Sequence, residues 1–174
     1  MFLKRFKEKS NKKYLNSILR ERSTNVDDSK IVSLGVIFCI DEIDDFEIFR
    51  TLATSIHVRP NKLKIIAYTE NIKEAPYFWD TCFHAKDFGW NGKIKNIELQ
   101  SFLDTKFDAL ISYYKNDILE LKLLTAASKA KFKIGTFQTD ERLNDFIIKT
   151  PLKAFKTFKT ELIKYLTILN KIKK

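Results

Sequence analysis

Four carboxylates follow the first apolar stretch of this sequence, and they are the side chains that come closest to a chemical site. Residues 31–40 read IVSLGVIFCI, a pattern typical of a buried strand. Asp41, Glu42, Asp44 and Asp45 come directly after it, and residues 43–56 carry apolar side chains at helical spacing. Carboxylates so placed suit either Mg²⁺ coordination or the dipole at a helix start. We expect the dipole role, with no metal.

Phosphate binding at this place is disfavoured by the same residues. The sequence has neither a G-x-G-x-x-G run nor a Walker loop at a helix start. Carboxylates repel phosphate unless a divalent cation lies between them. We therefore predict no cofactor. If a small-molecule or enzyme site exists, it belongs at the carboxyl edge of the strands. Its candidates are Asp41, Asp44, Asp45, Tyr113 and Asn116.

Cysteine and histidine offer a weaker alternative. The sequence has two of each, Cys39, Cys82, His57 and His84, and their spacing matches no zinc-binding pair. Cys82 and His84 would share one face of a strand, yet no third group can be named to orient the histidine. The sequence therefore predicts neither a zinc site nor a Cys–His nucleophile.

Residues 86–96, KDFGWNGKIKN, form the stretch whose composition secondary structure explains least. Asp87, Phe88 and Gly89 match the kinase magnesium motif, but nothing else of a kinase is present, so a turn is expected. An aromatic residue between two glycines and among lysines also suits base stacking or contact with a partner protein. The candidates are Lys86, Asp87, Trp90, Lys93 and Lys95.

The net charge of +10 lies at the two ends of the chain. Residues 1–22 and residues 151–174 each carry a net charge of +6, whereas the middle is nearly neutral. Such ends suit RNA, an acidic protein or an anionic lipid surface, or they only keep the protein in solution. We expect the two ends to share one anion-binding surface. Its candidates are Lys4, Arg5, Lys12, Lys13, Lys156, Lys159 and Lys164.

A cytoplasmic location is expected. The basic N-terminus is followed by no apolar signal core, and no run approaches the roughly 20 apolar residues of a membrane span. Two cysteines are too few for a disulfide framework, so reduced thiols are expected. Phe2, Leu3 and Phe6 lie among cations in a predicted helix over residues 2–20, which also suits an interfacial membrane anchor.

Residues 107–137 are the stretch around which the fold is predicted. Residues 109–114 read as a buried strand, and Asn116 or Asp117 would cap the helix that follows. Alternation returns over residues 131–137, which completes a βαβ unit. Its short connections favour parallel strands with a right-handed crossover.

The other elements extend this pattern. Strands are expected at residues 63–69, 81–84 and 146–150, and a short helix at residues 97–103. A last helix should begin at Pro151 with Thr150 as its cap, and its buried stripe should be Leu152, Phe155, Phe158, Leu162, Tyr165, Leu166 and Leu169. We predict one α/β, Rossmann-like, three-layer domain over residues 1–174, with a mostly parallel sheet of five or six strands. Residues 1–22 form its basic helix and residues 30–174 its body.

Two resemblances rest on these segments. The runs KLKIIAYT, KDFGWNGKIKN, FDALISYY, AKFKIG and DFIIKTP resemble a small family of flavobacterial proteins of unknown function, which implies no catalytic residues. Residues 107–135 are more distantly similar to the N-terminal, sugar-acceptor half of heptosyltransferase-like GT-B glycosyltransferases. That similarity implies a degenerate glycosyltransferase-like site.

The function predicted from the sequence is a non-catalytic binding module, whose basic helices contact RNA or a ribonucleoprotein. The alternatives are an enzyme at the strand edge, a protein–protein scaffold that uses the Trp90 loop, and peripheral membrane association. An enzyme should have a polar pocket with converging groups at that edge. A binding module should have the edge filled by its own side chains.

Overall fold

The computed structural model describes residues 1–71, 82–136 and 139–173, which form an α/β fold around one six-stranded sheet. The strand order is β3-β2-β1-β4-β5-β6, and every pair is parallel. The strands are β1 (Leu34–Cys39), β2 (Leu63–Tyr68), β3 (Cys82–Phe83), β4 (Ala109–Tyr113), β5 (Phe132–Gly135) and β6 (Phe146–Ile147). The order reverses between β1 and β4, as in a Rossmann-like fold, so the predicted fold class is confirmed.

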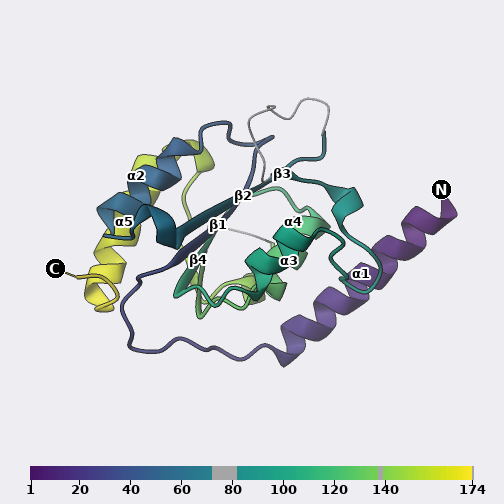
Figure 1. Ribbon diagram of the computed structural model, residues 1–174, viewed down its shortest axis with the longest axis horizontal. Helices are drawn as coiled ribbons and strands as arrows, with labels where there is room; N and C mark the ends of the chain where they lie inside the picture. The colour runs from purple at the N-terminus through teal and green to yellow at the C-terminus, as the bar shows by residue number, and fades with distance from the viewer. Residues whose placement is uncertain (72–81, 137–138, 174) are drawn as a thin grey trace.

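Helices cover both faces of the sheet (Figure 1). On one face lie α2 (Glu47–Ser55) and α5 (Phe155–Ile168), and on the other lie α3 (Ile97–Asp104) and α4 (Leu119–Ala127). The longest helix, α1 (Phe2–Glu21), packs on α4 on that second side. Single 3₁₀ turns occur at η1 (Pro60–Lys62), η2 (Ala85–Asp87), η3 (Glu141–Leu143) and η4 (Leu152–Ala154).

The central strand β1 is apolar throughout because both of its faces are covered. Val36 and Phe38 face α2 and α5, whereas Ile37 and Cys39 face α3 and α4. A Cβ at Gly35 would lie 2.8 Å from the Phe107 ring. The glycine therefore leaves room for the Phe107 ring to pack directly against the backbone of β1.

The C-terminal helix is part of the core, as expected, but its buried stripe is narrower than predicted. Phe158, Leu162 and Leu166 are buried at four-residue spacing against the sheet. Tyr165 and Leu169 keep 36% and 48% of their surface exposed, because they lie beside that line rather than on it.

Three helices begin later than the sequence predicted. Pro151 precedes the 3₁₀ turn η4, and α5 begins only at Phe155, so Thr150 is not its cap. Helix α4 begins after Ile118 without a side-chain cap, because Asp117 instead pairs with Lys122. Helix α2 begins at Glu47, whose N–H is accepted by the Asp45 carboxylate.

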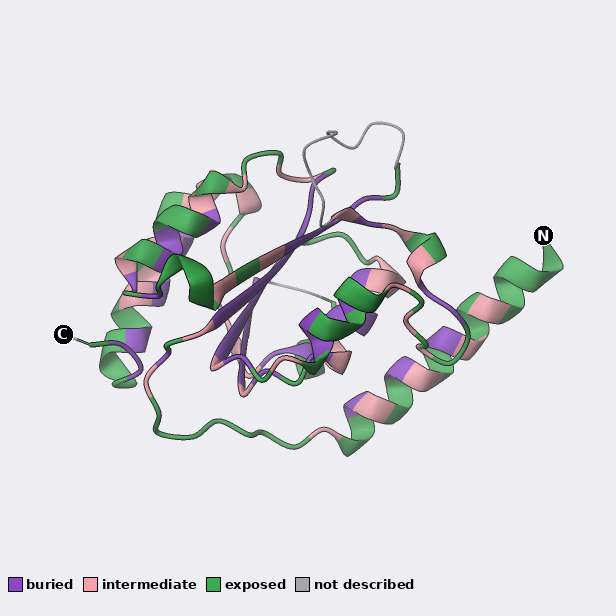
Figure 2. Cartoon of the chain, in the orientation of Figure 1, coloured by how far each residue is buried: buried purple, intermediate pink, exposed green. Residues whose placement is uncertain are grey.

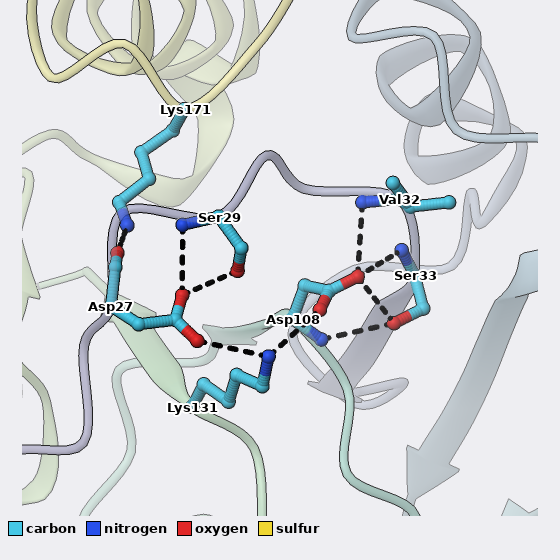
Figure 3. Close-up of polar contacts among 7 residues, drawn as sticks. All are labelled: Asp27, Ser29, Val32, Ser33, Asp108, Lys131 and Lys171. Carbon is cyan, nitrogen blue, oxygen red and sulfur yellow. Dashed lines mark hydrogen bonds and ion pairs between the residues drawn. The ribbon is translucent and has the colours of Figure 1, made fainter.

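Residues 22–33 lead from α1 to β1 past the amino-terminal ends of the strands (Figure 1). Polar contacts hold this connection (Figure 3). The Asp108 carboxylate accepts the N–H groups of Val32 and Ser33 at 3.0 and 2.9 Å, and Asp27 pairs with Lys131 at 3.0 Å. Burial opposes ionisation of Asp108, but the accepted N–H groups still hold its pKa below the usual value.

Candidate functional site

The carboxyl edge of the sheet, where open α/β folds bind ligands, is occupied by two carboxylates of the chain itself. The Asp41 carboxylate accepts the Thr69 hydroxyl at 2.7 Å and the Glu70 N–H at 2.8 Å, and so joins the ends of β1 and β2. The Glu42 carboxylate accepts the N–H groups of Lys115 and Asn116, at 3.1 and 3.0 Å, beyond the end of β4. Neighbouring N–H groups at the point where the strand order reverses are typical phosphate ligands. Here they donate to the Glu42 carboxylate instead.

The other strand-edge candidates do not converge with these two. Asp44 is exposed, and Asp45 accepts the first N–H of α2. The Tyr113 hydroxyl points to the other face and donates to the Leu152 carbonyl at 2.8 Å, and burial raises its pKa to about 12. The role predicted for Asp41 and Glu42 in the first turn of a helix is wrong, because they bridge strand ends instead. The part of the chain that the structure describes holds no group of three or more His, Cys, Asp or Glu suited to a metal ion.

The two thiols are poorly suited to nucleophilic chemistry. Burial raises the pKa of Cys39 to about 12 and that of Cys82 to about 11. Since the thiolate is the reactive form, neither is activated at neutral pH. His84 lies 2.9 Å from the Asp87 carboxylate, which also accepts its backbone N–H.

The loop at residues 84–95 is a hairpin-like turn that docks on α1. Phe88 pairs with Ile94 across it, and the buried Asn11 of α1 donates to the Gly89 carbonyl and accepts the Gly92 N–H, at 3.0 and 2.9 Å. Gly92 has φ +69°, and a Cβ there would lie 2.1 Å from the Tyr14 ring. The glycine at position 92 is therefore explained by its positive φ and by its contact with α1. Among the loop candidates, Lys86, Trp90, Lys93 and Lys95 are exposed and Asp87 is half-buried.

The expected shared cationic surface is wrong. Helix α1 lies on the α4 side of the sheet, whereas α5 lies on the α2 side (Figure 1). The sheet therefore separates Lys4, Arg5, Lys12 and Lys13 from Lys156, Lys159 and Lys164. The sequence left the face of each helix open, because helices can pack on either side of a parallel sheet.

The first turns of α1 are its exposed part (Figure 2). Phe2, Leu3 and Phe6 keep 79%, 74% and 57% of their surface exposed. Farther along, Asn11, Leu15 and Leu19 are buried against the body. The first turns of α1 thus expose apolar side chains to solvent, whereas the rest of the helix packs against the body of the protein.

A cavity of about 380 Å³ lies between α1, the end of β2 and the start of α4. Its lining combines four lysines with four carboxylates and one buried tyrosine, Tyr68. Among the binding-site candidates named from the sequence, Lys4 and Lys12 line it. Sequence reasoning missed Tyr68 because it closes an apolar strand, and missed Asn11 because it lies in a wholly polar turn. A polar residue at the carboxyl end of a buried strand was the available signal.

Comparison with known proteins gives a family but no activity. DUF6913, a family of unknown function, matches residues 7–169. The chain belongs to this family. No curated protein and no solved structure matches it. Membership of DUF6913 therefore carries no catalytic residues to this chain, and the flavobacterial and glycosyltransferase-like resemblances remain predictions. Within the described residues, no helix has the length and apolar character needed to cross a bilayer.

Proposed function

We propose that this protein is a non-catalytic binding module that attaches to an anionic lipid surface through the first turns of α1. The observation that carries the proposal is the exposure of Phe2, Leu3 and Phe6 at the end of a basic helix. An amphipathic helix of this composition lies in the membrane interface, with its apolar side chains among the headgroups.

The cations of α1 are placed to assist these side chains. Arg5, Lys9 and Lys13 recur at four-residue spacing and are exposed, and in the described structure their side chains form no ion pair. At this spacing they lie along one face of the helix, next to Phe2 and Phe6, which are also four residues apart. A groove on the helix is lined by residues of both kinds, including Phe2, Phe6 and Lys9.

The expected binding is reversible. Transfer of a large apolar side chain out of water contributes about 1.5–3 kcal/mol, and a cation near an anionic surface about 1 kcal/mol. The membrane affinity expected from three apolar side chains and a few cations is similar to that of a protein with one lipid chain and a basic patch. Such a protein stays at the membrane but can still dissociate from it.

A lipid surface is favoured over RNA, a ribonucleoprotein or an acidic protein by two features. The basic helices lie on opposite sides of the sheet, so they offer no continuous track for a phosphate backbone. Helix α1 exposes three large apolar side chains, Phe2, Leu3 and Phe6, and Leu3 has no ring to stack on a base. An enzyme is disfavoured because Glu42 occupies the amides at the switch point.

Sedimentation with vesicles tests the proposal. The full chain is mixed with phosphatidylcholine vesicles that contain, or lack, phosphatidylserine, and the bound fraction is measured. The double variant Phe2→Ser/Phe6→Ser should lose most binding to the anionic vesicles. Ile97→Ser is the matched control, because Ile97 of α3 keeps 85% of its surface exposed. Equal binding by the wild type and the double variant would refute the proposal.

Two further measurements distinguish lipid binding from self-association and from RNA binding. Light scattering after gel filtration should give a monomer at micromolar concentration; a dimer lost in the double variant would make the apolar end a self-association site. Fluorescence anisotropy with a single-stranded RNA should give weaker binding than the vesicles. Tight RNA binding by both the wild type and the double variant would replace the lipid proposal with the RNA one.

A further inference from the structure

Trp90 is an exposed aromatic residue beside the proposed membrane contact. It keeps 47% of its surface exposed, whereas the residues before it, Phe88 and Gly89, are buried. A single exposed apolar side chain needs no explanation, but several that lie together mark an interaction surface. The position of Trp90 relative to the exposed turns of α1 therefore decides what it can do.

The loop holds Trp90 at its tip, at the start of a two-residue turn. The Trp90 carbonyl accepts the Lys93 N–H at 3.0 Å, and the Lys93 carbonyl accepts the Gly89 N–H at 2.6 Å. Asn91 and Gly92 have φ +51° and +69°, the left-handed values that a tight hairpin turn of this kind requires. The backbone at Trp90 is thus fixed by hydrogen bonds on both sides of the turn.

Helix α1 holds this tip next to its own exposed apolar side chains (Figure 1). The Ser10 hydroxyl accepts the Asn91 N–H at 3.2 Å and donates to the Asn91 side-chain oxygen at 2.5 Å. Ser10 follows Phe6 by four residues and Leu3 by seven, so the three lie along one face of the helix. Four residues span about 6 Å of helix axis, which places the residue after Trp90 about one turn from Phe6.

Cations surround Trp90 as they surround the apolar turns of α1. In the described part of the chain, three exposed lysines of the loop form no ion pair: Lys86, Lys93 and Lys95. The one carboxylate of the loop, Asp87, is engaged by His84. Burial, and then the charge of Lys95, lower the pKa of Lys7 on α1, although Glu120 opposes this effect. The loop and the helix therefore contribute to one region of positive potential.

This combination of side chains matches the chemistry of a membrane interface. Tryptophan is enriched at the level of the lipid headgroups, because its ring is apolar and its indole N–H is polar. Lysines near the bilayer are attracted to anionic headgroups. We infer that the Trp90 loop is a second contact with the anionic lipid surface, with the indole among the headgroups and Lys86, Lys93 and Lys95 near their phosphates. The inference rests on the proposed function of α1 and adds to it a contact from a distant part of the chain.

The fluorescence of Trp90 tests the inference. The full chain has two tryptophans, so Trp79→Phe leaves Trp90 as its single tryptophan. This variant is titrated with phosphatidylcholine vesicles that contain, or lack, phosphatidylserine. With the anionic vesicles the emission should move to shorter wavelength, and lipids brominated on their acyl chains should quench it. With the neutral vesicles both effects should be weaker.

Sedimentation with the same vesicles measures the contribution of Trp90 to binding, with Trp79 left in place. Trp90→Ser should weaken binding to the anionic vesicles about tenfold, because roughly half of the side chain is still available for transfer out of water. Trp90→Phe should recover part of this loss. The matched control is Leu169→Ser, because Leu169 keeps 48% of its surface exposed at the end of α5, across the sheet.

The outcomes separate this inference from the proposed function. Vesicle binding that is lost in Phe2→Ser/Phe6→Ser but unchanged in Trp90→Ser, with no shift of the Trp90 emission, would overturn the inference alone. Absence of binding by the wild type would overturn both. Quenching of Trp90 by a single-stranded RNA, with no response to vesicles, would replace the lipid contact with base stacking.

Discussion

The Glu42 carboxylate lies 3.0 Å from the backbone nitrogen of Asn116 and so spans the boundary between β1 and β4. In a Rossmann-like sheet this boundary is the usual ligand crevice. The protein therefore places its own Glu42 carboxylate where related folds bind a phosphate. The cations of its basic helices are not part of this crevice.

Removal of this carboxylate should destabilise the fold. Glu42→Ala leaves the N–H groups of Lys115 and Asn116 without their acceptor, which should lower the free energy of unfolding by about 1–3 kcal/mol. Urea denaturation followed by circular dichroism measures the change. Asp44→Ala is the control, because Asp44 is exposed and should change stability by less than about 0.5 kcal/mol. Equal losses in the two variants would argue against a structural role for Glu42.

The clamp between α1 and the loop should depend on Asn11. Asn11→Ala leaves the Gly89 carbonyl and the Gly92 N–H unpaired in a buried place, at a cost of about 1–3 kcal/mol. Limited proteolysis should then cut α1 earlier than in the wild type. Ser17→Ala should behave as the wild type does, because Ser17 is exposed and its hydroxyl bonds Glu21 of the same helix. Unchanged cleavage in Asn11→Ala would show that the apolar contacts of Leu15 and Leu19 hold the helix alone.

Gly35 should tolerate no side chain. In Gly35→Ala the added Cβ would meet the Phe107 ring at 2.8 Å and Leu110 at 3.1 Å, and overpacking of this kind costs about 1–3 kcal/mol. Thermal denaturation should give a lower Tm than for Gly89→Ala, where the nearest atoms are 3.3 Å away. The second substitution Phe107→Leu should restore part of the loss; a purely additive loss would contradict the proposed clash.

Lys133 should give stability an unusual pH dependence. Its Nζ is buried and donates to the carbonyls of Thr125 and Ala126, and burial lowers its pKa from 10.5 to about 8. As the pH rises above 8, the folded state releases this proton before the unfolded state does, so the group favours folding increasingly up to pH 10.5. Its contribution over that window is at most about 3 kcal/mol.

Comparison with Lys133→Met isolates this contribution, because the thiols titrate in the same window with the opposite effect. The free energy of unfolding of the wild type, minus that of the variant, should rise between pH 8 and pH 10.5. A difference that is constant with pH would show that Lys133 keeps its ordinary pKa.

The sequence predicted the sheet well and the site poorly, for physical reasons. Strands buried on both faces, such as residues 34–39 and 109–113, are long apolar runs whose pattern depends on local residues alone. The bridges made by Asp41 and Glu42, and the clamp at Asn11, join segments far apart in the chain. No local pattern encodes which strand end or loop such a side chain will reach. The face of the sheet on which each basic helix packs is likewise determined by contacts between distant segments, and no local pattern encodes it.

Vesicle binding by charge variants on the two sides of the sheet tests the central claim most directly. Arg5→Gln/Lys9→Gln/Lys13→Gln removes three cations from α1, and Lys153→Gln/Lys156→Gln/Lys159→Gln removes three from the opposite side, at η4 and α5. The bound fraction on phosphatidylserine vesicles is measured at low and at physiological salt. The account predicts that the α1 variant loses most of its binding and its salt dependence, while the other variant binds as the wild type does. Equal losses in both variants, or a loss only on the α5 side, would contradict it.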